Sequence, residues 1–330
     1  MAVESVRVAN LRDDLPFGAK VLGVTRDNLK EASTRALIKQ AFDDRGVLVF
    51  EDVEQSPLMQ LAISDVLGQL KDHPVAAVSR TDQDLAPGVI DLNSDPNDRV
   101  TVEVDGKRLA NWLPWHFDHA YNNELNRAGV LRPISIAPEG GLTGFADGID
   151  LYKSLPADLR RKIDGLNVIY HLGVMIPNMR FGKPATLRDV HNCAEGIRVE
   201  EEAKKVPRAI HPAVWTRNTG EKVFHVGMLH AVGIEGHEDP EGDALLESVC
   251  QHIARNPRVY YHQWKLGQML TWDNWRVLHC VTGCDPAYPR RMHRTTIKGD
   301  YGLGHFEKQP PAASRPWQGT LSSKQPRGGL

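Results

Sequence analysis

The chain of 330 residues has few cysteines, almost no net charge and no long apolar run. Lys and Arg total 40 and Asp and Glu total 42, so the formal charge is −2 at pH 7. A protein that grips a nucleic-acid backbone needs a basic surface, and this balance argues against nucleic acid as a partner. No stretch of about 18 apolar residues occurs, so the sequence predicts no membrane-spanning helix.

Cysteine content and the N-terminal segment bear on the compartment. Residues 1–13 mix polar and apolar side chains and lack the apolar stretch of a secretory signal. The four cysteines, Cys193, Cys250, Cys280 and Cys284, form no CxxC pair and are too sparse for a disulfide scaffold. The Cys280–Cys284 spacing could in principle hold a metal, but reduced, partly buried thiols are the simpler interpretation. We therefore expect a cytoplasmic protein whose partners are small molecules.

Glycine motifs for nucleotides are also missing: no GxGxxG follows a predicted strand and no GxxxxGK[ST] occurs. What is present in the N-terminal part is a helix–strand–helix pattern. Apolar residues at helical spacing predict helices over residues 31–44 and 56–70, and a short apolar run predicts a buried strand over 47–50. Further helices are predicted over 150–164 and over the segment that follows Pro240.

The C-terminal half is rich in short β-type runs. These cover residues 259–264, 268–272, 277–281 and 293–297, and turn signals separate them. Short strands at this spacing favour a sandwich or jelly roll over a parallel sheet.

Two segments differ in composition from the rest. Residues 173–208 are polar and rich in charge, which is typical of a mobile flap inserted in a domain, although a solvated helix explains them equally well. The segment 306–330 contains four prolines and little apolar periodicity, so we expect a loosely ordered tail. The remaining chain, residues 1–305, is predicted to form a single domain.

Three residues have the chemistry of metal ligands. His116 and Asp118 are two positions apart on a predicted strand, so that both side chains point to the same side. Such a pair alone is more often structural, and His279 on an apolar strand would by itself be a core histidine. Two histidines and one carboxylate can nevertheless occupy one face of an octahedral metal and leave three positions for a cosubstrate and oxygen, as in non-haem iron(II) oxygenases.

Two arginines follow His279 and favour the metal-site interpretation over the structural one. Arg290 and Arg294 are four positions apart on a predicted strand and therefore face the same side. Because arginine binds carboxylates through two parallel hydrogen bonds, one could hold a cosubstrate carboxylate and the other an anionic substrate. The alternative is a pair of surface arginines.

Taken together, these motifs resemble the taurine dioxygenase and 2,4-dichlorophenoxyacetate dioxygenase family, which depends on iron(II) and 2-oxoglutarate. The matching stretches occur in the family's order between about residue 18 and residue 303: His73-Pro74-Val75, residues 115–118, 140–143, 145–147 and 272–274, His279, and residues 290–300.

The resemblance implies a role for each matching residue. His116, Asp118 and His279 correspond to the iron ligands of the family. Thr143 and Arg290 correspond to the residues that bind the distal carboxylate of 2-oxoglutarate.

It also implies a place for the substrate. His73 and Arg294 correspond to residues that hold the substrate's anionic group, and Asn111 corresponds more loosely to a substrate contact. Trp215 and Trp275 stand where the family commonly has arginine. This departure suggests either a bulkier, more apolar substrate or a change in packing.

The implied fold is mainly β with flanking helices, a double-stranded β-helix of the cupin-like jelly-roll type. The implied reaction uses Fe(II), 2-oxoglutarate and O2 to hydroxylate a small anionic substrate, which is a sulfonate, an aryloxyalkanoate or another carboxylate, with succinate and CO2 as coproducts. Family members often form dimers or tetramers, so a homo-oligomer is left open. Two alternatives are a catalytically silent protein that binds 2-oxoglutarate or another ligand, and a zinc hydrolase that uses the same three ligands.

Overall fold

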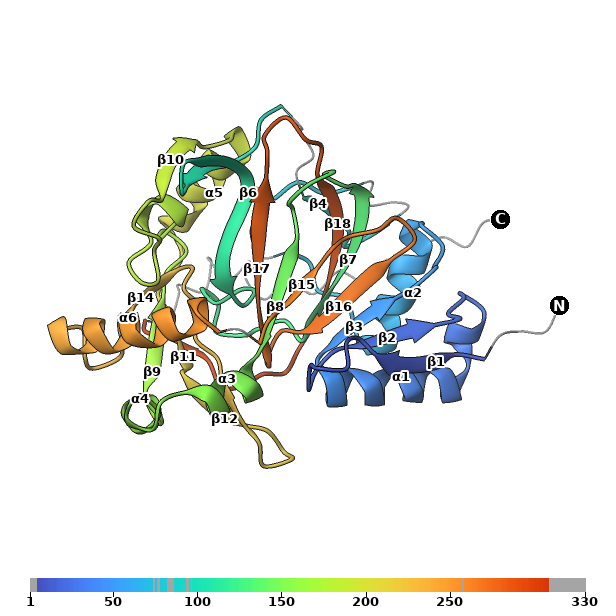
Figure 1. Ribbon diagram of the computed structural model, residues 1–330, viewed down its shortest axis with the longest axis horizontal. Helices are drawn as coiled ribbons and strands as arrows, with labels where there is room; N and C mark the ends of the chain where they lie inside the picture. The colour runs from blue at the N-terminus through green and yellow to red at the C-terminus, as the bar shows by residue number, and fades with distance from the viewer. Residues whose placement is uncertain are drawn as a thin grey trace.

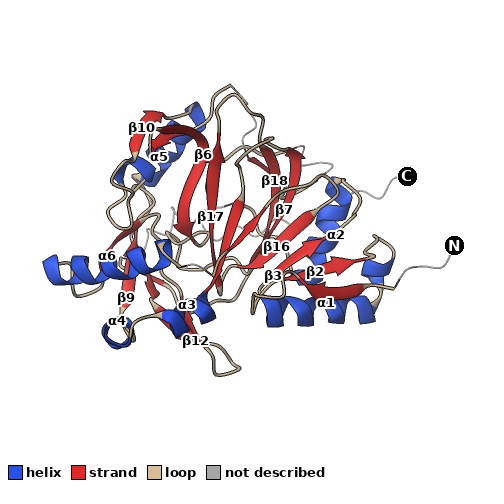
Figure 2. Cartoon of the chain, in the orientation of Figure 1, coloured by secondary structure: helices blue, strands red, loops and turns tan. Residues whose placement is uncertain are grey.

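A computed structural model of the chain describes residues 5–73, 75, 78–81, 86–92, 95, 97–256 and 258–308. Two large β-sheets form its centre, with helices around them (Figures 1 and 2). The first sheet has the strand order β1 (Arg7–Asn10), β2 (Ala19–Leu22), β3 (Val47–Phe50), β16 (Met269–Asp273), β7 (Ala128–Ser135), β18 (Arg291–Ile297) and β4 (Ile90–Leu92). The second has the order β10 (Arg188–His191), β5 (Thr101–Val104), β6 (Lys107–His116), β17 (Val277–Cys284), β8 (Thr143–Asp147) and β15 (Tyr260–His262).

Smaller elements complete the fold. A four-stranded sheet contains β14 (Ala231–Ile234), β9 (Asn167–Tyr170), β11 (Ala209–Pro212) and β19 (His305–Phe306), and a hairpin pairs β12 (Val214–Thr216) with β13 (Lys222–Phe224). The helices are α1 (Ala32–Arg45), α2 (Pro57–Leu67), α3 (Gly148–Ser154), α4 (Ala157–Ile163), α5 (Ala194–Ala203) and α6 (Pro240–Ala254), with short 3-10 turns η1 (Asn28–Lys30) and η2 (Ile176–Asn178). In the described part of the chain, every helix is too short or too polar to cross a lipid bilayer.

Successive strands alternate between the two large sheets. Strands β6, β7 and β8 belong to the second, the first and the second sheet, and β15 to β18 alternate in the same way. Within both sheets the pairs are antiparallel except β2 with β3. A chain that winds back and forth between two antiparallel sheets is a double-stranded β-helix, so the predicted jelly-roll fold is confirmed.

The apolar patterns of the sequence explain where the elements pack. All four residues of β3 are buried, as their apolar run predicts, and β3 lies inside the first sheet between β2 and β16. Helices α1 and α2 cover the outer face of that sheet through Ile38, Phe42, Met59 and Ile63. The inner face packs against the second sheet, where Trp272 meets Phe145. Figure 1 shows both helices beside β1 to β3, at one end of the molecule.

Local signals set the ends of the predicted helices. Ser56 caps α2 because its hydroxyl oxygen accepts a hydrogen bond from the backbone N–H of Met59 at 3.1 Å. Gly46 ends α1 with a φ of 71°, a left-handed conformation that glycine adopts without strain. The helix predicted after Pro240 is confirmed as α6.

The helix predicted over 150–164 is wrong as a single helix. The structure has two helices, α3 and α4, with Leu155 extended between them. Pro156 explains the break, because proline lacks the backbone N–H of a helix interior and disfavours helical geometry in the preceding residue. The four C-terminal strands are confirmed as β15 to β18, and β17 continues three residues beyond its predicted end, to Cys284.

The two compositional segments differ in how much of them is described. Residues 173–208 contain η2, β10 and α5, and β10 pairs with β5 at the edge of the second sheet. The predicted tail starts at Phe306, which belongs to β19 and pairs with Ala209 of β11. Residues 309–330 lie outside the described residues. All four cysteines are buried free thiols, and burial raises the pKa of Cys280 to about 12.

Buried histidines make the fold sensitive to acid. Burial lowers the pKa of His225 to about 3 and that of His211 and His262 to about 4. Each accepts or donates a hydrogen bond inside the protein: His225 and His211 contact backbone carbonyls, and His262 contacts the Tyr260 hydroxyl.

We predict that stability is constant above about pH 6.5 and falls between pH 6.5 and about pH 4. In this window the unfolded state binds protons at these histidines and the folded state does not, so each histidine lowers the free energy of unfolding by up to about 1.4 kcal/mol per pH unit. Urea unfolding between pH 7.5 and 5 measures this slope, and the His211→Gln variant should show a shallower one. A slope identical in the variant would contradict the assignment.

Candidate active site

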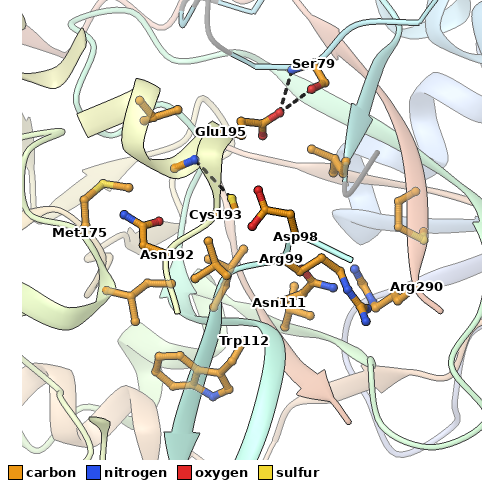
Figure 3. A pocket seen from close by; sticks show the side chains of 18 of the residues that line it. Ser79, Asp98, Arg99, Asn111, Trp112, Met175, Asn192, Cys193, Glu195 and Arg290 are labelled. Atoms are coloured by element: carbon orange, nitrogen blue, oxygen red, sulfur yellow. Dashed lines mark hydrogen bonds between the residues drawn. The ribbon is translucent and has the colours of Figure 1, made fainter. Parts of the chain in front are cut away.

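A cavity of about 510 Å³ lies between the two large sheets. Its walls come from β6, β8 and β17 of the second sheet and from β7, β16 and β18 of the first. The segment 173–208 covers one side through η2 and α5. Figure 3 shows this side, where Cys193 and Glu195 of the covering segment face Asp98, Arg99 and Asn111.

The three candidate metal ligands meet in this cavity. His116 ends β6 and is the ladder partner of His279 on β17, so the pairing of the two strands places the imidazoles side by side with ring centroids 4.1 Å apart. Asp118 follows two residues later, and its Oδ1 lies 3.6 Å from His279 Nε2. One potential ligand atom from each of the three side chains lies within 4.8 Å of the other two, and all three residues are buried.

His116 is oriented and neutral. Its Nδ1 lies 2.8 Å from the carbonyl oxygen of Pro114 and donates to it, which leaves the lone pair of Nε2 directed toward the other ligands. Burial and, after it, the neighbouring His279 lower the pKa of His116 to about 3. A neutral imidazole with its second nitrogen held by a carbonyl is the form that binds a metal ion.

Asp118 is ionised in spite of its burial. Burial alone would raise the pKa of its carboxyl group, but the positive charge of Arg294 and, after it, the adjacent imidazole of His279 hold the pKa well below its usual range. Arg294 Nη1 donates a hydrogen bond to Oδ1 at 2.9 Å, and Nη2 lies 2.9 Å from Oδ2. Two imidazoles and a carboxylate converging on one point fit a divalent metal ion bound on one face, with the opposite face open to the cavity.

Arg290 and Thr143 form a second polar region of the cavity wall. Arg290 is 7% exposed, and its Nε donates to the carbonyl oxygen of Gly141 at 3.0 Å. Among the described residues no carboxylate pairs with it, and burial lowers its pKa to about 10. A buried cation without a counter-charge is a binding site for an anion.

Thr143 is oriented by a residue that sequence reasoning missed. Its hydroxyl oxygen accepts a hydrogen bond from the indole Nε1–H of Trp264 at 3.0 Å, so its hydroxyl hydrogen can be donated to another group. Trp264 is 121 residues away in the chain, and no motif in the sequence marks it.

The three candidate substrate residues are placed differently. Arg294 and Asn111 line the cavity, and Asn111 adopts a left-handed φ of 61° with its side-chain nitrogen buried and without a hydrogen-bond partner among the described residues. His73 is not among the residues that line the cavity. Its ring packs edge-on against His119 with centroids 5.0 Å apart, and burial lowers its pKa to about 3. Seven of the eight predicted site residues thus line the same cavity.

Trp215 and Trp275, which replace arginines of the family pattern, do not line the cavity. The indole N–H of Trp215 donates to the carbonyl oxygen of Trp275 at 2.8 Å, and the guanidinium of Arg127 lies 4.7 Å from the centroid of the Trp275 ring. Their exchange therefore changes packing behind the site and does not reshape the wall that a substrate would touch.

The covering segment is attached at the N-terminal end of α5. The hydroxyl and backbone N–H of Ser79 both donate to Glu195, at 2.6 and 3.1 Å (Figure 3). Asp98 accepts a hydrogen bond from the backbone N–H of Ala194, at the start of the helix. Apolar side chains of the opposite walls, among them Trp112, Leu131, Trp272, Val281 and Met292, line the space below. The cavity therefore combines polar groups at the metal ligands with an apolar interior.

Comparisons with known proteins show which family and which solved structures the chain is similar to. The sequence model of the taurine catabolism dioxygenase TauD, TfdA family matches residues 8–296. An (S)-phenoxypropionate/alpha-ketoglutarate-dioxygenase of Sphingobium herbicidovorans is 29% identical, over 87% of this chain and 93% of that protein. An alpha-ketoglutarate-dependent 2,4-dichlorophenoxyacetate dioxygenase of Cupriavidus pinatubonensis is 28% identical, over 84% and 94%. The crystal structure of a taurine dioxygenase from Burkholderia xenovorans has the same fold, with a TM-score of 0.68 over 93% of this chain and 98% of that chain at 22% identity.

We predict that Gly129→Ala disturbs the cavity wall. A Cβ at this position would lie 2.6 Å from the buried ring of Trp272. The centroid of that ring is 4.8 Å from the centroid of the His279 ring. Overpacking of this kind costs about 1–3 kcal/mol of stability. Urea unfolding measures that loss, and tryptophan fluorescence of the folded variant should report a displaced indole. Unchanged stability and emission would contradict the prediction, because they would show that Trp272 moves aside without cost.

Proposed function

The chain belongs to the TauD/TfdA family of iron(II)- and 2-oxoglutarate-dependent dioxygenases, and we propose on this basis that His116, Asp118 and His279 bind its iron. The observation that carries the proposal is the convergence of their ligand atoms within 4.8 Å in a buried cavity. The enzyme uses Fe(II), 2-oxoglutarate and O2. When bound, the iron with its cosubstrate and oxygen supplies the oxidising chemistry, and succinate and CO2 are the coproducts.

The protein's own residues then bind and orient. Arg290 and Thr143 hold the distal carboxylate of 2-oxoglutarate, because the guanidinium is buried with no carboxylate partner among the described residues and the threonine hydroxyl is free to donate. This anchor fixes one end of the cosubstrate, so that its 2-oxo acid end reaches the open face of the three ligands in a single orientation.

The substrate is an organic anion with an apolar body. Arg294 beside Asp118 and Asn111 farther along β6 supply hydrogen-bond donors to the cavity, and the apolar walls accommodate the body. We include His73 among the substrate residues on the family motif alone. Its ring packs against His119, and it is not among the residues that line the cavity. An aryloxyalkanoate is favoured over a sulfonate, since the similar enzymes of Sphingobium and Cupriavidus are named for phenoxypropionate and 2,4-dichlorophenoxyacetate.

The surroundings of the site complete the proposal. Residues 173–208 act as a flap that closes over the cavity and excludes water during turnover. Residues 1–305 form one catalytic domain in the cytoplasm, where four free thiols stay reduced, and copies of the chain form a homo-oligomer. The partners are small molecules.

The first test is turnover. We predict that the protein with Fe(II), 2-oxoglutarate and O2 forms succinate, and that an aryloxyalkanoate in a panel of aryloxyalkanoates, sulfonates and simple carboxylates stimulates this at least about tenfold. His279→Ala removes one ligand and should abolish the reaction. An anaerobic titration with iron(II) and 2-oxoglutarate should give a visible charge-transfer band. A colourless complex would instead support a zinc hydrolase or a silent binding protein.

The second test concerns the cosubstrate anchor. We predict that Arg290→Met raises the Michaelis constant for 2-oxoglutarate by about 10- to 100-fold, because a charge-assisted hydrogen bond to the distal carboxylate is lost. Arg198→Met is the matched control, since Arg198 also lines the cavity but belongs to α5. Steady-state kinetics with varied 2-oxoglutarate decide the outcome. An equal change in both variants would contradict a specific role for Arg290.

A further inference from the structure

Strand pairing places two of the three ligands but not the third. The ladder between β6 and β17 holds His116 opposite His279, and β6 ends at His116. Asp118 lies two residues beyond that end, where no strand partner is assigned to it. Something other than the sheet must therefore fix the backbone of the residue that supplies the carboxylate.

The side chain of Asn274 holds the backbone of Asp118. The backbone N–H of Asp118 donates to Asn274 Oδ1 at 2.7 Å, and Asn274 Nδ2 donates to the carbonyl oxygen of Asp118 at 3.1 Å. A primary amide presents one acceptor and two donors, as a peptide group presents its carbonyl and N–H. Asn274 thus replaces the strand partner that Asp118 lacks, although the two residues are 156 positions apart.

Asn274 is itself held rigidly. It is fully buried, and its Nδ2 also lies within hydrogen-bond distance of the backbone carbonyl and the side-chain oxygen of Asn126, at 3.2 and 3.1 Å. Its own carbonyl oxygen accepts a hydrogen bond from His225 Nε2 at 2.8 Å, and its N–H donates to the carbonyl of Arg127 at 3.0 Å. The amide is therefore fixed in place before any ligand binds.

The position of Asn274 in the chain gives this contact its meaning. Asn274 lies in the turn that joins β16 to β17, and β17 carries His279. The amide ties the backbone of Asp118 to the element that bears another ligand, while Arg294 holds the carboxylate group from the other side. Asn274 is not among the residues that line the cavity, so it lies behind the site.

We propose that Asn274 is a positioning residue of the metal centre, which sets the placement of the Asp118 carboxylate relative to the two imidazoles by clamping the Asp118 backbone. This inference rests on the metal-binding role proposed for His116, Asp118 and His279. Partners behind a ligand that fix its orientation typically change metal affinity about 10- to 100-fold when they are removed.

The test measures metal binding without turnover. Purified protein is titrated anaerobically with Mn(II) alone, and free Mn(II) is counted by electron paramagnetic resonance. Asn274→Ala should raise the Mn(II) dissociation constant at least tenfold. The matched control is Asn28→Ala, another buried asparagine whose side chain bonds the backbone of Gly23 and Thr25 away from the cavity. It should lower the melting temperature and leave the dissociation constant within about twofold of the wild type.

A second variant covers the case in which Asn274→Ala does not fold. Asn274→Asp keeps the size and the acceptor for the Asp118 N–H but turns an oxygen toward the carbonyls of Asp118 and Asn126, so it too should weaken Mn(II) binding. A wild-type constant in a folded Asn274 variant overturns the inference and leaves the metal site intact. A wild-type protein that binds no Mn(II) overturns the proposed metal site itself.

Discussion

The antiparallel pairing of β6 with β17 is the contact on which the site depends. It brings His116 and His279, far apart in the chain, to one ladder position, and it does so in the middle of the second sheet, where strands on either side prevent displacement. The alternation of strands between the two sheets then places Trp272 of the first sheet against His279. The site therefore depends on the strand topology, because no local segment contains more than two of the three candidate ligands.

Charge is distributed unequally along the cavity wall. Near the ligands the cation of Arg294 and the carboxylate of Asp118 neutralise each other, so neither charge is buried without a partner. At the other end Arg290 has no such partner among the described residues. A dicarboxylate keto acid matches this pattern, since its two ends would meet a metal and an uncompensated guanidinium.

The sequence predicted those features that local patterns encode. The strand at 47–50, α6 and the strands β15 to β18 follow from apolar periodicity and turn residues, and the family resemblance and the fold class are confirmed. The break at Pro156 was missed because the leucine spacing continues through it. Trp264 was not predicted as part of the site, and the motif at 272–274 did not show what Asn274 contacts, because each acts on a residue more than a hundred positions away. The placement of His73 outside the lining residues likewise depends on tertiary packing that its motif does not encode.

The register between β17 and β8 bears on the length of the keto acid that the proposed site can hold. In the ladder of β17 with β8, His279 is opposite Phe145 and Val281 is opposite Thr143. Thr143 therefore lies one strand across and two residues along from the histidine, which corresponds to about 4.8 Å by about 7 Å of backbone. Those spacings belong to the peptide geometry and no side-chain exchange alters them. If Thr143 anchors the cosubstrate as proposed, the sheet register therefore sets the distance from the metal to that anchor, and with it the length of dicarboxylate that fits.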